Sequence, residues 1–325
     1  MNKISKIYKE LTRKELTKII ENYFGLETEF KAKLISGGLF NTTYHIKVNN
    51  KKEIILRVGP VNKQLILPFE NNLMKAEEYV YKHFERKEIP CSKVLVCDVD
   101  KNIIDRDYMI VEYINSSVLS ELKVNKEVLD SIYKETGKYI NIVHEITSNQ
   151  FGRAYDVSIG AGFNLWSEYL KDEVSKLGAR LKEFNIFSET EIEKFTLVFC
   201  EYKDILDEIK VPHLIHADLW AGNILVREDK GIYEVAAIID ADRAVFGDCE
   251  FEFASPWITN EAFMEGYGKE LSCDTNSTIR RKIYKLIYSL IDTYVWMVEY
   301  DNREAYEENR RESIKIVEEI MANKE

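Results

Sequence analysis

The stretch HLIHADLWAGNILV, residues 213–226, places three polar side chains in an apolar, strand-like frame. His216, Asp218 and Asn223 stand at offsets of two and five among Ile, Leu and Val. A buried polar group that finds no partner costs free energy, so a segment that served folding alone would avoid this pattern. The stretch therefore indicates a functional loop at the end of a buried strand.

Phosphoryl transfer needs these residue types at this spacing. A carboxylate can accept the proton of an attacking hydroxyl, and an amide oxygen five residues later can bind Mg²⁺, which prefers oxygen ligands. Asp218 is therefore the predicted catalytic base and Asn223 a predicted metal ligand, while His216 is expected to brace the catalytic loop by hydrogen bonding. The apolar run AAIID ends at Asp240, whose carboxylate suits a second metal ligand.

Hydrophobic periodicity predicts a β-rich first part of the chain. Thr12 and Glu15 have the spacing of a capping box, and one apolar face over 12–24 indicates a helix. Further strands and one more helix follow from alternation and helical period; the strands are predicted at 29–36, 42–48, 53–59, 93–100 and 107–114, and the helix at 70–86. We therefore expect a small lobe over residues 1–114.

Helical patterns dominate after Ile114. The exception is a predicted β-hairpin at 223–240. Helices are expected at 126–146, 164–184, 189–209, 278–300 and 304–322. The sequence thus predicts an α+β chain of two lobes, in which residues 115–325 form a larger, mostly helical lobe with an embedded hairpin.

Two motifs carry a resemblance to a known family. HADLWAGNILV and IIDADRAVFGDCEFEFA are similar to the H-x-D-x-x-x-x-N and I-D-x-x-x-A-x-x-G-D signatures of the aminoglycoside phosphotransferase/choline kinase family. The resemblance runs from about Leu34 to Ala254. It implies a protein-kinase-like fold with Asp218 as base and with Asn223 and Asp240 as Mg²⁺ ligands.

The end of the second motif departs from the commonest family pattern. Cys249 replaces a frequent proline and Glu252 a frequent aspartate, and neither change is expected to touch the chemistry. Asp248, just before them, is expected to brace the catalytic loop.

The family order places the nucleotide-binding parts upstream. In LISGGLFNTTYHI, residues 34–46, Gly37 and Gly38 permit close approach of the backbone to phosphate, and Asn41 and Thr42 could add donors. Taken alone, a Gly-Gly pair is better explained by an ordinary strand turn. Its order relative to the other motifs favours the nucleotide.

Arg57 stands where protein kinases place a strand lysine that binds phosphate. Glu77 is its expected ion-pair partner, ahead of Glu70 and Glu78. In the hinge stretch DYMIVEYINS, the carbonyl of Glu112 and the amide of Ile114 are expected to contact the adenine edge. Taken alone, Arg57 could also be a surface cation on an edge strand.

Bulk composition excludes several classes of protein. Of 325 residues, 45% are hydrophobic and 31% charged, which is typical of a globular chain. The N-terminus lacks the apolar core of a signal peptide, no apolar run reaches the length of a membrane span, and the five cysteines form no CxxC pair. We therefore expect a cytoplasmic protein, monomer or homodimer, that binds neither membranes nor, with a net charge of −11, nucleic acids.

The charge is distributed unevenly. Residues 1–116 carry 20 Lys and Arg against 16 Asp and Glu, and the remainder carries 25 against 40. This suits an anionic nucleotide on the first lobe and a cationic acceptor on the second, although acidic helices can also be merely solvated. Acidic and aromatic residues are candidate walls of the acceptor site: Trp220, Asp242, Glu261, Glu265, Asp292 and Glu299.

The predicted function is therefore ATP- or GTP-dependent phosphorylation, with Mg²⁺, of a hydroxyl on a small cationic acceptor. The first candidate acceptor is an aminoglycoside-type antibiotic, whose phosphorylation would give antibiotic resistance. A housekeeping kinase of a choline-like amine or a sugar is the alternative, and a nucleotide-binding pseudokinase without catalysis is the third. His144, Trp166, Trp257 and Trp296 are expected to be packing residues rather than ligands of any substrate.

Overall fold

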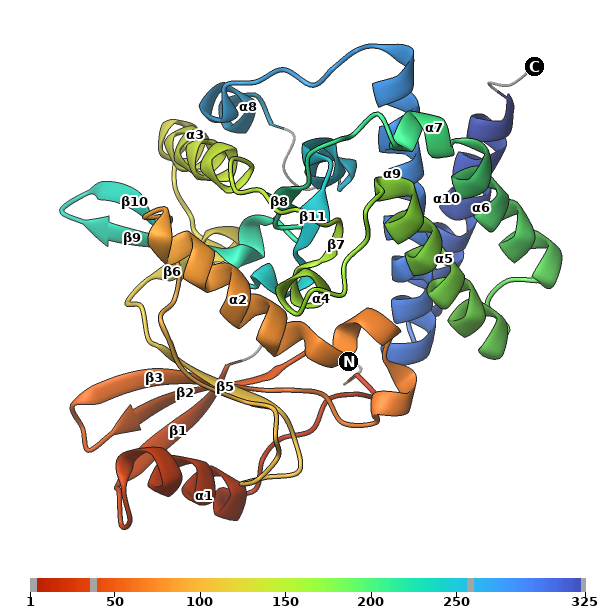
Figure 1. The fold of residues 1–325 in the computed structure, drawn as a ribbon. Coiled ribbons are helices and arrows are strands. Elements are labelled where there is room, and N and C mark those ends of the chain that lie inside the picture. Colours follow the sequence, from red (N-terminus) through yellow and green to blue (C-terminus); the bar gives the residue numbers. More distant parts are fainter. Residues whose placement is uncertain (1–4, 36–39, 256–259, 323–325) are drawn as a thin grey trace.

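The computed structural model describes residues 5–35, 40–255 and 260–322 (Figure 1). The small lobe is built on a five-stranded antiparallel sheet in the order β1-β2-β3-β5-β4. Apolar residues alternate in its central strands, so that one face is buried. The strands are β1 Phe30–Ile35, β2 Thr42–Val48, β3 Lys52–Val58, β4 Val94–Asp98 and β5 Tyr108–Glu112.

Helix α1, Arg13–Phe24, covers one face of this sheet (Figure 1). Thr12 and Glu15 form the expected capping box, in which Glu15 N–H donates to Thr12 Oγ1 and Thr12 N–H to Glu15 Oε2. Leu16, Ile19 and Ile20 are buried against the strands. The predicted helix over 12–24 is therefore present at almost its predicted bounds.

Helix α2, Leu73–Arg86, lies between the small sheet and the larger lobe (Figure 1). It begins later than the predicted residue 70, because two short 3-10 turns, η1 Lys63–Leu65 and η2 Pro68–Asn72, precede it. Met74 packs beneath the sheet, whereas Val80 belongs to the core of the larger lobe. Since α2 contributes to both cores, the lobe boundary after Ile114 stays a prediction.

The larger lobe is mainly helical, as expected. Two predictions need correction: the helix over 189–209 breaks at Tyr202, and the one over 278–300 ends at Tyr294 and continues as a π-helical turn. The helical elements are α3 Lys126–Val143, α4 Ala154–Ser158, α5 Trp166–Glu183, α6 Glu189–Glu201, α7 Lys203–Leu206, α8 Glu261–Tyr267, α9 Thr275–Tyr294, η7 Val295–Glu299 and α10 Arg303–Ala322, with 3-10 turns η3 Leu119–Glu121, η4 Ala221–Asn223, η5 Ala241–Arg243 and η6 Cys249–Ala254.

Two small sheets hold the loops between these helices. The predicted hairpin is present as β9 Ile224–Asp229 and β10 Ile232–Ile238, and β6 Ser117–Val118 pairs with β9 as a third strand. A second sheet, β7-β11-β8, was not predicted; it comprises β7 Gly152–Arg153, β8 His213–Ile215 and β11 Val245–Gly247. Its strands fix the loop after β8 beside the loop before β11.

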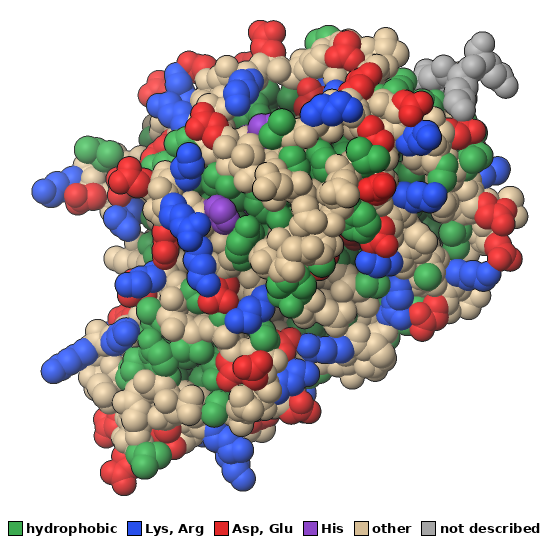
Figure 2. Space-filling model, viewed as in Figure 1, with side chains coloured by type: hydrophobic (Ala, Val, Ile, Leu, Met, Phe, Trp, Pro, Cys, Tyr) green, Lys and Arg blue, Asp and Glu red, His purple; other side chains and the backbone are tan. Residues whose placement is uncertain are grey.

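The helices form two groups around these sheets. Helices α5, α6, α9 and α10 pack together on one side, and α3 packs against α8 on the other (Figure 1). None of the described helices is both long enough and apolar enough to cross a bilayer. On the face shown in Figure 2, acidic and basic side chains are interspersed.

Candidate active site

The loop after β8 is held from inside the protein. His216 is fully buried, and its Nε2 lies 2.9 Å from the carbonyl oxygen of Ile239. The amide of Asp218 donates to His216 Nδ1 at 3.3 Å. Ala217 between them has φ +62°, a left-handed conformation that a non-glycine residue holds only where its surroundings enforce it. His216 thus joins the catalytic loop to the strand that leads to Asp240, and it does not face solvent.

Glu252, for which the sequence predicted no part in the chemistry, supports the same loop. Its Oε2 accepts the amide of His216 at 2.8 Å and its Oε1 that of Ala217 at 3.1 Å. Asp248 was expected to brace this loop but is engaged elsewhere: its Oδ2 accepts Arg280 Nε at 3.2 Å and the hydroxyl of Tyr284 at 2.8 Å. The bracing carboxylate is therefore Glu252, and Asp248 anchors α9.

Asn223 is fixed against the predicted base. Its Nδ2 donates to the carbonyl oxygen of Asp218 at 2.7 Å and to Asp218 Oδ2 at 3.2 Å. Ile239 N–H donates to the carbonyl of Asn223 at 2.9 Å. Because its amide nitrogen is occupied, Asn223 has Oδ1 left to offer to a metal ion. The two side chains form one rigid unit.

The environment of Asp218 disfavours its charged form. Burial raises the pKa of Asp218 to about 6, against the opposing effect of the cationic Arg243 nearby. Burial likewise raises the pKa of Asp292, on α9, to about 6, and Asp218 adds to that rise. A base whose pKa lies just below neutral is ionised at pH 7 and can still take up a proton.

Arg57, on β3, is enclosed by three carboxylates. Its Nη1 donates to Glu77 Oε1 on α2 at 2.5 Å, its Nη2 pairs with Asp240, and its Nη2 lies 3.7 Å from Asp242 Oδ2. Glu77 is fully buried and Arg57 nearly so. The fork of an arginine can contact several carboxylates at once, which a lysine cannot do as well. Of the three acids considered as its partner, the structure brings Glu77 to Arg57; Glu70 and Glu78 lie elsewhere.

The three carboxylates are suited to a divalent cation. One oxygen atom from each of Glu77, Asp240 and Asp242 lies within 4.8 Å of the others. Carboxylate oxygens are hard ligands of the kind that a divalent cation prefers, and burial, with the neighbouring Asp240 and Glu77, raises the pKa of Asp242. Asp240 has φ +59°, and its N–H donates to the hydroxyl of Tyr81 at 3.1 Å. The left-handed backbone of Asp240 and its hydrogen bond to Tyr81 therefore set the direction of its carboxylate.

Arg243, beside Asp218, joins the two lobes. Its Nη2 lies 3.1 Å from Glu70 Oε1, in the 3-10 turn that precedes α2. Burial, with the neighbouring carboxylate of Glu70, raises the pKa of Glu299, so this carboxyl is protonated at neutral pH. Glu299 was a candidate acceptor contact; it is instead 1% exposed and belongs to this internal group.

The sequence of the chain matches a known enzyme family over most of its length. The model of the phosphotransferase enzyme family matches residues 31–275. The chain belongs to this family. It is accordingly a small-molecule kinase with the two-lobed, protein-kinase-like fold expected from its motifs. A search of curated proteins found no match.

Solved structures of this phosphotransferase fold cover almost the whole chain. The chain is similar to aminoglycoside phosphotransferase APH(4)-Ia in a ternary complex with AMP-PNP and hygromycin B, at 19% identity and TM-score 0.65, covering 94% of this chain and 98% of that one. A fructosamine-3-kinase candidate from Thermobifida fusca is 14% identical with a TM-score of 0.64, and the match covers 94% of this chain and 100% of that one. APH(2″)-IIIa in its complex with GDP and kanamycin is 17% identical with a TM-score of 0.59, and the match covers 95% of this chain and 98% of that one. At these identities the likeness shows the fold alone.

The other residues predicted to contact the nucleotide lie in different settings. Gly37 and Gly38 are outside the described residues, and Asn41 is buried directly before β2. The hydroxyl of Thr42 donates to the carbonyl oxygen of Lys9 at 3.0 Å, and the side chain is fully buried. This corrects the expectation that Thr42 offers a donor to phosphate.

The hinge residues lie where β5 leaves the small sheet. Glu112 is the last residue of β5, its side chain is exposed, and its N–H donates to Lys93 O at 2.9 Å. Ile114 follows, with its carbonyl oxygen accepting Ser116 Oγ at 3.0 Å. These placements leave their contact with adenine a prediction.

The candidate acceptor residues do not form one wall. Trp220 lies between Asp218 and Asn223 and is 40% exposed, with its ring packed over Gly222. Asp242 instead belongs to the cluster around Arg57. Glu265, exposed on α8, pairs with Lys134, and within the described part of the chain neither it nor Glu261 contacts the catalytic loop. Helix α8 is held on α3 because Gly266 passes directly over the backbone of Lys134.

Proposed function

We propose that this phosphotransferase transfers the γ-phosphoryl group of ATP or GTP to a hydroxyl of a small amino-bearing acceptor, with Asp218 as base. The observation that carries the proposal is the unit formed by Asp218 and Asn223. It lies close enough to Asp240 for the two aspartates to interact electrostatically. One surface thus offers a base, an amide oxygen and a metal-binding carboxylate together.

Each group would have a separate task. Asp218, ionised above about pH 6, orients the acceptor hydroxyl and takes its proton as the new P–O bond forms. Arg57 holds phosphate oxygens, while Glu77 fixes the direction of its guanidinium. Asn223 Oδ1 and the carboxylate of Asp240 would hold Mg²⁺, which neutralises phosphate charge when it is bound. His216 and Glu252 keep the loop in place and touch no substrate.

Amino groups on the acceptor fit the electrostatics of the second lobe. The buried carboxyl of Asp292 lies near both Asp218 and Arg243, and residues 117–325 carry 40 acidic side chains against 25 basic ones. Ammonium groups are bound by such carboxylates. Hygromycin B and kanamycin, which occur in complexes of two structural neighbours, carry amino groups, and fructosamines do as well. We rank aminoglycosides first and fructosamine-type amino sugars next.

A housekeeping kinase of a choline-like amine or another small alcohol is the alternative function. The exposed face of Trp220 beside the base favours it, because a quaternary ammonium group binds well over an aromatic ring. A non-catalytic nucleotide-binding protein is disfavoured, since Asp218, Asn223 and Asp240 are all present and held in place.

One screen separates these functions. Release of ADP and GDP would be measured with ATP or GTP and Mg²⁺ over aminoglycosides, fructosamines, amino alcohols and neutral sugars, with Asp218→Asn as the matched control. The proposal expects at least one amino-bearing acceptor to stimulate release in the wild type and not in D218N. Stimulation by neutral alcohols alone would overturn the acceptor class. Equal release by wild type and D218N would overturn the role of the base.

A further inference from the structure

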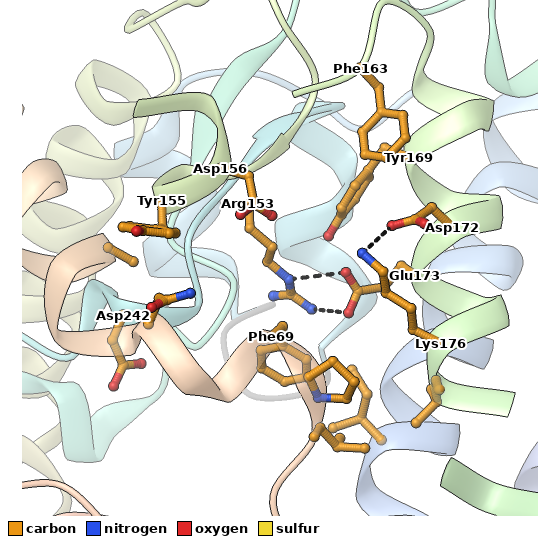
Figure 3. Close-up of a pocket in the computed structure, with 16 residues that line it drawn as sticks. Phe69, Arg153, Tyr155, Asp156, Phe163, Tyr169, Asp172, Glu173, Lys176 and Asp242 are labelled. Atoms are coloured by element: carbon orange, nitrogen blue, oxygen red, sulfur yellow. Dashed lines mark hydrogen bonds and ion pairs between the residues drawn. The ribbon is translucent and has the colours of Figure 1, made fainter. Parts of the chain in front are cut away.

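Buried polar side chains of this protein are almost all hydrogen-bonded within the described residues. The cavity between the start of α2, helix α4 and helix α5 is an example, because Arg153 there donates to both oxygens of Glu173, at 3.3 Å from Nε and 3.0 Å from Nη2 (Figure 3). In the described part of the chain, the buried side-chain atoms without a hydrogen-bond partner are Asn141 Oδ1, His144 Nε2, Arg180 Nε and Glu299 Oε1. A buried donor without a partner costs free energy, so each of these atoms needs a physical reason.

His144 directly follows helix α3, and its side chain is buried at 1% exposure. Its Nδ1 lies 2.8 Å from the hydroxyl of Tyr267, on α8. The rings of Phe253 and Tyr267 meet the imidazole edge to face, with centroids 6.2 Å and 5.4 Å away. On the remaining side, Nε2 lies 3.6 Å from Oε2 of Glu252, the carboxylate that holds the catalytic loop. The unpartnered nitrogen therefore faces a buried carboxylate.

The contact with Tyr267 assigns the proton of the imidazole. Burial raises the pKa of Tyr267, so its phenol keeps its proton. Among the described residues, the hydroxyl has no hydrogen-bond partner besides Nδ1 of His144. Nδ1 therefore accepts the phenol proton, and a neutral imidazole that accepts at Nδ1 carries its own proton on Nε2. The N–H thus points toward Glu252.

Glu252 has a demanding arrangement to keep. Its Oε2 accepts the amide of His216 and its Oε1 that of Ala217, so its carboxylate must hold one orientation. At 3.6 Å the N–H of His144 is too far for a hydrogen bond, but in a buried site it still attracts the carboxylate electrostatically. The carbonyl oxygen of His144 also accepts Nδ1 of His213 at 2.7 Å, where β8 begins. One residue therefore supports both ends of the segment that leads into the catalytic loop.

We propose that His144 is a positioning residue for phosphoryl transfer: its Nε2–H holds the carboxylate of Glu252, which holds the backbone amides next to Asp218. A histidine that served packing alone would leave Nε2 against an apolar neighbour. The effect on catalysis rests on the proposed function, whereas the contact itself does not. Because the buried ring reaches neither nucleotide nor acceptor, its loss should lower kcat and leave the KM values nearly unchanged.

Two substitutions separate the donor from the ring. The amide nitrogen of a glutamine can take the place of Nε2, whereas that of an asparagine takes the place of Nδ1. His144→Gln therefore keeps a donor toward Glu252, and His144→Asn does not. Tyr139→Phe is the control, because its hydroxyl lies on α3, 3.4 Å from Glu135 Oε1, and does not contact the catalytic loop. Thermal unfolding of each variant shows whether it is folded.

Hydrogen–deuterium exchange of the His216 and Ala217 amides tests the positioning without any ligand. Exchange should be about tenfold faster in H144N than in the wild type, and close to the wild type in H144Q and Y139F. NMR of histidine labelled with ¹⁵N should show a protonated Nε2 for His144, assigned by the loss of its signal in H144Q. Equal exchange in folded H144N and wild type would overturn the proposal, as would equally fast exchange in H144N and H144Q, or an unprotonated Nε2.

Steady-state kinetics with ATP, Mg²⁺ and kanamycin measure the catalytic effect. H144N should lower kcat by about tenfold and keep both KM values within about twofold, and H144Q should restore most of kcat. An unchanged kcat in H144N whose loop amides exchange faster would overturn the role in positioning. If neither kanamycin nor any other acceptor of the screen is phosphorylated while the exchange results hold, the proposed function is refuted and the contact stands.

Discussion

Oε2 of Glu252 accepts a hydrogen bond from the backbone amide of His216 at 2.8 Å, and both residues are buried. The catalytic loop is thus held by a carboxylate 36 residues further along the chain. A charged acceptor that receives two backbone amides makes stronger hydrogen bonds than a neutral one. The same carboxylate stabilises the left-handed turn at Ala217, which directs the next residue, Asp218, out of the strand.

Glu252→Gln should lower kcat by about tenfold or more and leave the KM values of nucleotide and acceptor nearly unchanged. The reason is that a neutral amide accepts one of the two backbone amides poorly, and a hydrogen bond to a charged group contributes about 1.5–3 kcal/mol. Steady-state kinetics measure this. Glu250→Gln is the matched control, because Glu250 pairs with Arg281 and does not contact the catalytic loop. An equal loss in both variants would refute a specific role for Glu252.

The acid limb of the pH profile should report Asp218. Its pKa is raised to about 6 by burial, and as the proposed base it must be ionised. Activity expressed as kcat/KM should therefore be full above about pH 7 and fall up to tenfold per pH unit below 6. Asp218→Asn should lower kcat by about 10²–10⁴-fold while nucleotide affinity is retained. A wild-type profile that is flat down to pH 5 would contradict this.

Glu77→Gln should weaken nucleotide binding and lower thermal stability. Glu77 is fully buried against Arg57, and breaking a buried ion pair by removing one partner costs about 3–5 kcal/mol. Without it, Arg57 shifts toward Asp240 and Asp242 and away from phosphate. Nucleotide titration and thermal unfolding measure the two effects. Glu78→Gln, one residue on, breaks only half-exposed pairs with Lys75 and Lys82, and it should be almost silent in both measurements.

Gly222→Ala should damage the acceptor side of the site. A Cβ built at Gly222 would lie 2.2 Å from the ring of Trp220, and that ring forms part of the rigid loop between Asp218 and Asn223. The ring must therefore move, and we expect the acceptor KM to rise more than the nucleotide KM. Trp220→Phe, a smaller ring at the same place, is the companion variant. If both variants keep the acceptor KM of the wild type, Trp220 does not contact the acceptor.

Local pattern was enough to predict much of this fold. The strand at 42–48 and the helix at 12–24 follow from alternation and capping, which act over a few residues. Asp218 and Asn223 could be singled out as candidates because polar groups in an apolar strand frame need partners, and the structure brings the two side chains together. The pairing of strands β7, β8 and β11 could not be predicted from the sequence. Strands of two or three residues are too short to show an alternation of apolar and polar residues.

The errors within the site arise from contacts that are distant in sequence. Thr42 looks like a phosphate donor until Arg106, 64 residues away, and Lys9 take its hydroxyl. Asp242 looks like a wall of the acceptor site, but the left-handed turn at Asp240 directs the chain so that Asp242 meets Arg57. The direction of a side chain after such a turn is not encoded in hydrophobic periodicity.

Glu299→Gln should stabilise the protein at alkaline pH, whereas Glu70→Gln should destabilise it. Burial beside Glu70 raises the pKa of Glu299, so the folded protein holds a proton that the unfolded chain releases above about pH 4.5. Stability contributed by this group is therefore complete at acid pH and falls as pH rises toward the folded-state pKa. Glutamine is neutral at every pH, so the difference in melting temperature between E299Q and wild type should grow from pH 6 to pH 9. Glu70, in contrast, pairs with Arg243 as a carboxylate, and E70Q should lower stability near neutral pH. If the difference in melting temperature between E299Q and wild type stayed constant from pH 6 to pH 9, Glu299 would be ionised in the folded protein and the prediction would be wrong.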